Sequence, residues 1–154
     1  MADVLGASIS RLADYCDIAE LRLDLMHAEL GGAVRPWSHL KGFPLLFTAR
    51  RADEGGAGEL DAATREALLG EVLDEAACVD IEVASISEMA GLIDKLRGRK
   101  LPWIASFHDF EKLPENAVLE ERLALARSAG AAVFKVAAKL HSPADLARLA
   151  EFQL

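Results

Sequence analysis

The stretch IAELRLDL at residues 18–25 decides the fold class, because charged and apolar side chains alternate along it. The charged positions are Glu20, Arg22 and Asp24, and leucines fill the positions between them. Successive side chains of a β-strand point to opposite faces of its sheet. We therefore predict a strand with one apolar face, packed against helices, and one polar face.

Four more short runs rich in β-forming residues follow, separated by stretches of helical periodicity. The runs span residues 43–51, 78–84, 101–110 and 131–138, and the helical stretches span residues 61–77, 86–99, 114–130 and 142–154. A loosely periodic helix also precedes the first strand. This order of one helix and then five βα units predicts a parallel sheet covered by helices.

The polar faces of these strands distinguish an open doubly wound sheet from part of a βα barrel. Polar side chains recur at alternate positions near the end of each run, namely Thr48, Arg50, Asp80, Glu82, Ser106, His108 and Lys135. Polar faces are costly to bury unless they line a shared cavity, and barrel enzymes place that cavity at the carboxyl ends of their strands. A complete barrel needs about 250 residues. We therefore predict an α/β fold of the (β/α)8 TIM-barrel class, as an incomplete barrel of about five units in one domain over residues 1–154.

Composition excludes several classes of protein. The 154 residues carry a net charge of −8, with 52% hydrophobic and 27% charged residues, so the chain is globular and acidic. An acidic surface argues against binding nucleic acid or anionic membranes. The two cysteines form no CxxC pair, which leaves neither a disulfide framework nor a zinc site. Without a signal peptide or an apolar span of about 18 residues, we expect a cytoplasmic protein.

Lys135 lies inside the otherwise apolar stretch AAVFKVAA, where burial favours a neutral, nucleophilic amine. Such an amine condenses with a ketone to give an iminium ion, which acidifies the neighbouring carbon. The alternative is a structural ion pair between Lys135 and an internal carboxylate such as Glu82. Lys135 alone does not decide between the two interpretations.

Two further groups suit carbonyl chemistry. His108, in SFHDF, is a candidate general base at the end of a strand, and Glu54, in RRADEGGAG, is a carboxylate that could orient it. The alternatives are a hydrogen-bonded core histidine and an ordinary turn carboxylate. Arg22 and Arg50 could bind a substrate carboxylate bidentately, or could only neutralise the acidic residues beside them.

Six short motifs together resemble type I 3-dehydroquinate dehydratase. They are ELRLD at 20–24, TAR at 48–50, EGG at 54–56, DIE at 80–82, SFHDF at 106–110 and FKVAA at 134–138. They occur in that family's order and cover nearly the whole chain. The resemblance implies a (β/α)8 barrel of the shikimate pathway that dehydrates the small molecule 3-dehydroquinate to 3-dehydroshikimate, with no metal or organic cofactor.

The resemblance also implies a role for each matched residue. Lys135 would form the Schiff base, His108 would act as general acid and base, and Glu54 would orient the histidine. The substrate-binding positions would be Glu20, Arg22 and Arg50.

The chain departs from the family pattern at both ends, because the family's first strand and last two strands have no counterpart in it. We therefore keep an alternative function, that of a truncated or divergent homologue, weakly active or inactive, acting as a binding or assembly module. Five contiguous strands also leave two open sheet edges, which predicts self-association into a homo-oligomer.

Overall fold

A computed structural model of the chain describes residues 2–31 and 35–153, and its centre is one parallel sheet. The strands lie side by side in chain order, β1 to β5. Their bounds are Ala19–Arg22, Leu45–Thr48, Cys78–Glu82, Trp103–Asp109 and Val133–Ala138. Every neighbouring pair is parallel, which confirms the five predicted βα units.

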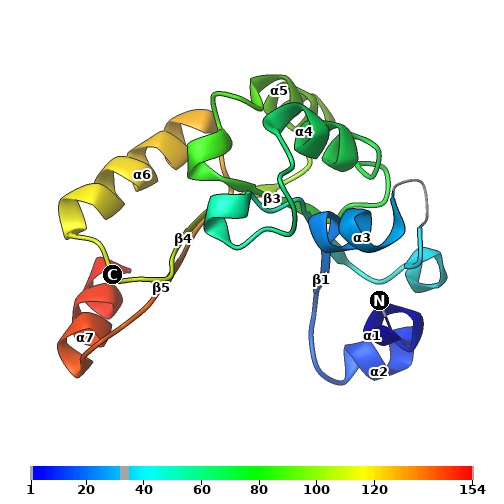
Figure 1. Cartoon of the computed structure of the whole chain (residues 1–154), viewed down its shortest axis with the longest axis horizontal. Coiled ribbons are helices and arrows are strands. Elements are labelled where there is room, and N and C mark those ends of the chain that lie inside the picture. Colours follow the sequence, from blue (N-terminus) through cyan, green and yellow to red (C-terminus); the bar gives the residue numbers. More distant parts are fainter. Residues whose placement is uncertain (1, 32–34, 154) are drawn as a thin grey trace.

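Helices alternate with these strands, and the sheet is curved into an arch (Figure 1). Helices α4, α5 and α6 lie along its convex side, and the two ends of the chain lie at opposite feet of the arch. The α-helices α1 to α7 span Ala2–Leu5, Ile9–Ala13, Leu23–Leu30, Ala62–Gly70, Ala90–Arg99, Asn116–Ala129 and Pro143–Phe152. Three short 3-10 helices, η1 to η3, span Ser38–Leu40, Ala52–Glu54 and Val83–Ser85.

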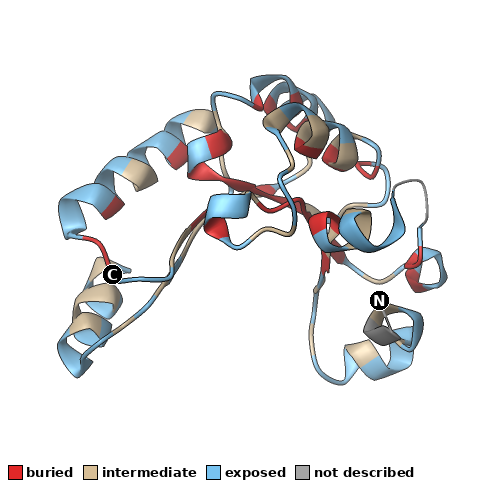
Figure 2. Ribbon diagram, viewed as in Figure 1, coloured by how far each residue is buried: buried red, intermediate tan, exposed pale blue. Residues whose placement is uncertain are grey.

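The main hydrophobic core lies between the convex face of the sheet and these helices. Apolar strand residues such as Phe47, Val79 and Ile81 are fully buried there, together with Leu92 and Leu96 of α5. Burial is concentrated in the central strands, whereas β5 is only partly covered (Figure 2). The predicted apolar face is therefore the helix-packed face, and the polar face lies on the concave side.

Several element boundaries differ from the sequence-based prediction. Strand β1 ends at Arg22, and Asp24 lies in the first turn of α3, a helix that the sequence analysis missed. The leading helix is two short helices, α1 and α2, and the long helix predicted over residues 61–77 ends at Gly70. The sequence at 22–25 continues the strand-like alternation, so periodicity alone could not reveal the change to helix.

The two outer strands each have one neighbour in the described chain, since β1 pairs with β2 and β5 pairs with β4. Within the same residues, no helix combines the length and apolar character required to cross a membrane.

Candidate active site

Lys135, on β5, extends to a carboxylate two strands away. Its Nζ lies 2.8 Å from Oδ2 of Asp80, which is fully buried on β3, whereas the lysine side chain is 34% exposed. The other carboxylate oxygen, Oδ1, accepts a 2.5 Å hydrogen bond from Ser106. Burial alone would raise the pKa of Asp80, but Arg50, Lys135 and the hydroxyl of Ser106 lower it overall. The structure thus contains the predicted ion pair, with Asp80 as the partner of Lys135 in place of Glu82.

His108 and Glu54 are in direct contact, as the sequence analysis expected. Glu54 ends η2 and is buried, and its Oε2 accepts a 2.9 Å hydrogen bond from the backbone N–H of His108. The same oxygen lies 3.0 Å from Nδ1 of the imidazole. Two contacts to one carboxylate fix both the backbone and the ring of His108. Of the two interpretations of Glu54, the histidine partner is the one that the geometry favours.

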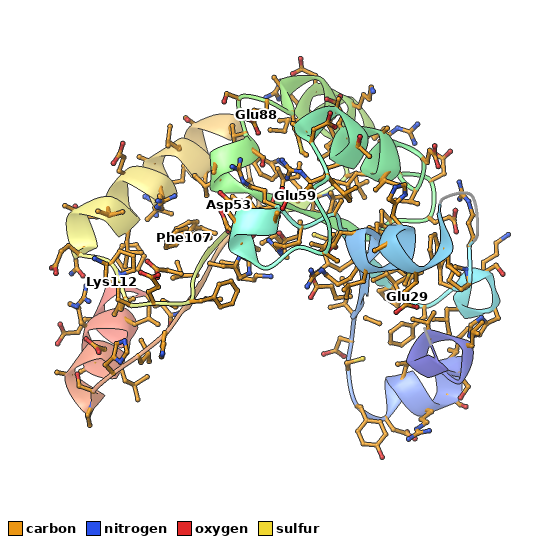
Figure 3. The ribbon with its side chains drawn as sticks, in the orientation of Figure 1. Glu29, Asp53, Glu59, Glu88, Phe107 and Lys112 are labelled. Carbon is orange, nitrogen blue, oxygen red and sulfur yellow. The ribbon has the colours of Figure 1, made fainter. Side chains whose placement is uncertain are left out.

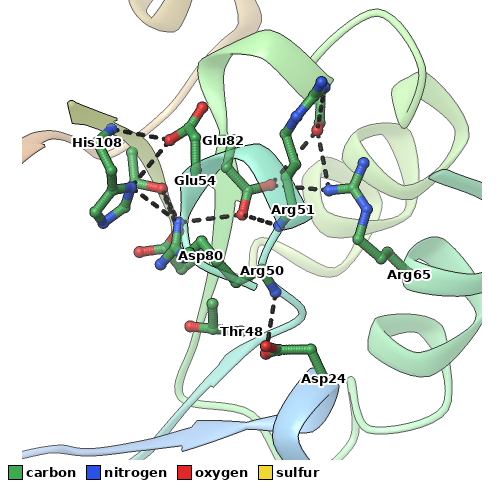
Figure 4. Close-up of polar contacts among 12 residues, drawn as sticks. Asp24, Thr48, Arg50, Arg51, Glu54, Arg65, Asp80, Glu82 and His108 are labelled. Atoms are coloured by element: carbon green, nitrogen blue, oxygen red, sulfur yellow. Dashed lines mark hydrogen bonds and ion pairs between the residues drawn. The ribbon is translucent and has the colours of Figure 1, made fainter. Parts of the chain in front are cut away.

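Arg50 lies at the centre of the polar cluster and is only 3% exposed (Figure 4). Its Nη1 lies 3.0 Å from Asp80, 3.1 Å from Glu82 and 2.6 Å from the hydroxyl of Ser106. The same nitrogen is 3.4 Å from Nδ1 of His108. Arg50 therefore neutralises internal carboxylates, which was the alternative to its role as a free carboxylate clamp.

Glu20, on β1, is more accessible than Arg50. Its carboxylate accepts a 2.6 Å hydrogen bond from Thr48 and lies 3.8 Å from Nη2 of Arg50. The Glu20 side chain remains 39% exposed, so it could still contact a ligand on the concave face.

Arg22 and Asp24 connect β1 to the loop that carries Glu54. Arg22 donates two hydrogen bonds to Asp24, of 2.9 and 2.6 Å, and one of 2.9 Å to the carbonyl of Gly55. The buried Asp24 also accepts from the backbone N–H groups of Arg50 and Ala57. Burial opposes ionisation of Asp24, but these donors together lower its pKa. One carboxylate therefore fixes both ends of the loop.

Gly56 allows this loop to close tightly. A Cβ atom at this position would lie 2.2 Å from the carbonyl oxygen of Arg50, far inside van der Waals contact. Only glycine fits here, which explains the second glycine of the EGG motif by backbone packing.

Two buried polar residues behind the cluster were missed by the sequence analysis, Arg65 on α4 and Ser85 on η3. Arg65 donates to Glu82 at 3.0 Å and to Ser85 at 3.1 Å. A sequence signal did exist, since Arg65 lies four residues before the buried Leu69 and so on the apolar face of α4. A charged residue on that face indicates a buried partner.

The cluster contains many carboxylates but no arrangement suited to a metal ion. Throughout residues 2–31 and 35–153, no three His, Cys, Asp or Glu side chains are grouped closely enough to hold one. The acidic side chains of the cluster bind arginine, lysine and backbone N–H groups.

Comparisons with known proteins agree on one family. The family model described as "Type I 3-dehydroquinase" matches residues 2–154. The 3-dehydroquinate dehydratase of Haloquadratum walsbyi is 34% identical over 130 residues, covering 79% of this chain and 53% of the relative. That of Klebsiella pneumoniae subsp. pneumoniae is 32% identical over 154 residues, covering 96% of this chain and 57% of the relative. The chain thus spans about half the length of the curated relatives it matches.

Solved structures give the same result for the fold. The 3-dehydroquinate dehydratase from Aquifex aeolicus VF5 superposes with a TM-score of 0.75 at 27% identity, covering 94% of this chain and 67% of that one. The enzyme from Geobacillus kaustophilus HTA426 superposes with a TM-score of 0.81 at 24% identity, covering 94% and 59%. These similarities confirm the predicted class, a part of a TIM-barrel-like fold.

Proposed function

Because the chain belongs to the type I 3-dehydroquinase family, we propose that it dehydrates 3-dehydroquinate to 3-dehydroshikimate through a Schiff base on Lys135. The observation that carries the proposal is the position of the lysine. Its amine lies on the same polar face as the His108–Glu54 pair, held by the buried Asp80 and still one-third exposed to a ligand.

The reaction follows from these groups. The Lys135 amine attacks the C3 ketone, and the adduct loses one water to give a protonated imine. His108 takes a proton from C2, and the electron pair moves into the imine to form an enamine. The enamine then expels the C1 hydroxyl, which leaves as water with the proton from His108. A second water hydrolyses the imine and frees both the product and Lys135.

The remaining residues have supporting roles. Glu54 orients the His108 imidazole, and its two contacts to that residue support this role. Glu20 and Arg22 bind the substrate from β1, where both side chains are partly exposed. Arg50 is buried, and it supports the site by holding the internal carboxylates and His108 in place.

We also propose that the chain assembles into a homo-oligomer through its open sheet edges. Within residues 2–31 and 35–153, β1 and β5 each pair with one strand only, and the N–H and C=O groups of their outer edges are templates for pairing with another strand. Light scattering checks this, because a mass matching a single chain would contradict it. Localisation in the cytoplasm remains a prediction from composition.

A second candidate function is binding of the substrate without turnover. The observation that favours it is the saturation of Arg50 by internal carboxylates, which leaves less positive charge for a substrate carboxylate.

The two functions are separated by one assay. The product is a conjugated enone, so turnover of 3-dehydroquinate appears as a rise in ultraviolet absorbance. A rise that is absent in Lys135→Ala supports the dehydratase. Saturable binding of 3-dehydroquinate without any absorbance change supports the binding module.

A further inference from the structure

Arg65 is a buried arginine outside the six motifs that carry the family resemblance. It lies on α4 and is only 3% exposed, although it contacts none of the residues proposed to touch the substrate or reacting atoms. Its Nη1 donates to Oε2 of Glu82 and to the hydroxyl of Ser85, at 3.0 and 3.1 Å. Burying an arginine costs desolvation free energy. The residue that Arg65 contacts therefore indicates what Arg65 does.

The partner of Arg65, Glu82, connects α4 to the loop that carries Glu54. While Oε2 faces Arg65, Oε1 accepts 3.1 Å hydrogen bonds from Nη1 of Arg50 and from the backbone N–H of Arg51. Arg51 directly precedes η2, the turn that ends in Glu54. Two contact routes therefore lead from Glu82 to His108, one through the Arg50 guanidinium and one through residues 51–54.

Both routes depend on the charge of Glu82. A carboxylate accepts hydrogen bonds at both oxygens, whereas a protonated carboxyl group must donate from one of them. Burial raises the pKa of Glu82 above its ordinary value, and Arg50, the N–H of Arg51 and Arg65 act against that rise. Loss of the Arg65 charge removes one of the cations that keep this buried carboxylate ionised.

We propose that Arg65 is a positioning residue for the catalytic site: it holds the Glu82 carboxylate, which in turn holds Arg50 and the loop carrying Glu54 against His108. The inference rests on the proposed function for the identity of the reaction, and on the contacts alone for its effect on His108.

Other charged groups lie around this carboxylate on neighbouring elements, and Arg22 of β1 interacts with it electrostatically. Asp80 of β3 shares the Arg50 guanidinium, and Glu88 lies 3.7 Å from Nη2 of Arg65. Asp53, Glu59 and Glu88 line one outer cavity with Arg51 and Arg65 (Figure 3). The acids nearest to Arg65 would push the pKa of Glu82 further up if Arg65 were neutralised, because like charges disfavour a carboxylate.

The test follows the imidazole resonances of His108 by NMR as pH is varied, in the wild type, Arg65→Met and Arg65→Lys. Protonation of Glu82 displaces Arg50 and so appears as an inflection in these resonances. We expect Arg65→Met to move that inflection upward by about one pH unit, the size expected for loss of a neighbouring opposite charge. Arg65→Lys, which keeps the charge, should restore the wild-type position.

A matched control is Arg97→Met, on the exposed side of α5, where Arg97 pairs with Asp94. It should leave the His108 resonances unchanged. If Arg65→Met does not fold, Arg65→Gln removes the same charge while keeping hydrogen-bond donors. A folded, neutral variant with the wild-type His108 titration would contradict the proposal.

Turnover provides the second measurement and separates this inference from the proposed function. In Arg65→Met, the acid limb of the pH–rate profile for 3-dehydroquinate turnover should move to higher pH, together with the inflection in the His108 resonances. A uniform loss of rate at every pH indicates a merely structural role and contradicts the inference. Absence of turnover in the wild type would contradict the proposed function instead, and the His108 titration would still decide the role of Arg65.

Discussion

Strands β3 and β5 carry the two ends of one ion pair in very different surroundings. Asp80 on β3 is fully buried between two paired strands, whereas Lys135 lies on the outer strand of the described sheet, 34% exposed. Asp80 also binds Arg50 and Ser106, so it keeps two partners when the lysine leaves. The ion pair therefore joins a fully buried carboxylate, held by several partners, to a lysine that is partly exposed on the outer strand.

The largest expected effect is on turnover, and it separates the proposed role of His108 in the polar cluster from that of Lys135 on the outer strand. His108→Ala should lower turnover about 10²–10⁴-fold, the contribution of a positioned general base. Imine formation should persist, because this variant retains Lys135, the proposed nucleophile on β5. Turnover is measured by absorbance, and the imine by mass after borohydride reduction. Loss of the imine together with the rate would show that the two regions do not act separately.

The two ends of the ion pair should also differ in how much they contribute to the free energy of unfolding. Asp80→Asn leaves the buried Arg50 with one carboxylate fewer and should cost about 3 kcal/mol of unfolding free energy. Lys135→Met should cost under about 1 kcal/mol, because the lysine is partly exposed and Asp80 keeps its other partners. Urea denaturation measures both free energies of unfolding, and Lys139→Met, directly after β5, serves as the control. Equal costs would contradict the contrast between core and edge.

Because Glu54 is proposed to act by orienting His108, its loss should lower turnover less than the loss of His108. Glu54→Gln keeps an oxygen that accepts from the His108 backbone but removes the charge beside the imidazole. We expect turnover to fall about tenfold, below the range for removing the base itself. A loss as large as that of His108→Ala would assign Glu54 a direct chemical role.

The smallest effect concerns acid stability at the other end of the sheet. The pKa of Asp24 is lower in the folded protein than its ordinary value, so this group stabilises the fold above that ordinary value, near pH 4. The stabilisation is lost as pH falls through the folded-state pKa. Asp24→Asn should cost about 1–3 kcal/mol at pH 7, the effect of unsatisfied buried donors.

The difference between wild type and Asp24→Asn should then shrink as the solution is acidified. Urea denaturation at neutral and acidic pH measures it. Asp94→Asn, an exposed change on α5, should alter stability by less than about 0.5 kcal/mol at either pH. A constant difference for Asp24→Asn across the range would show that its ionisation contributes nothing.

The sequence predicted the fold where periodicity is unambiguous. Alternating polar and apolar residues located five strands and both of their faces, and Ser142 and Pro143 marked the start of α7, which has a capping box. Helix α3 was missed because its first turn continues the alternation of β1. Periodicity describes single elements, so it cannot locate a boundary where strand and helix patterns coincide.

The sequence indicated individual candidate residues for the site but not all of their contacts. Motif order proposed Lys135, His108 and Glu54 as catalytic residues, and the structure brings the last two into contact. The alternative interpretation of Lys135 was an ion pair with an internal carboxylate such as Glu82, and the structure pairs it with Asp80, which lies on the same face of β3. The strand register aligns Lys135, Ser106 and Glu82, so register alone favours Glu82. Glu82 instead accepts hydrogen bonds from Arg50, Arg65 and the backbone N–H of Arg51, and such long-range partners cannot be read from the sequence.

The most direct test of the central claim is borohydride reduction of the chain in the presence of 3-dehydroquinate, followed by peptide mass analysis. The account predicts a ligand-sized mass increase on the peptide that contains Lys135, and its loss in Lys135→Ala. An adduct on Lys139 or Lys112, or one retained in Lys135→Ala, would contradict the assignment of the Schiff-base lysine.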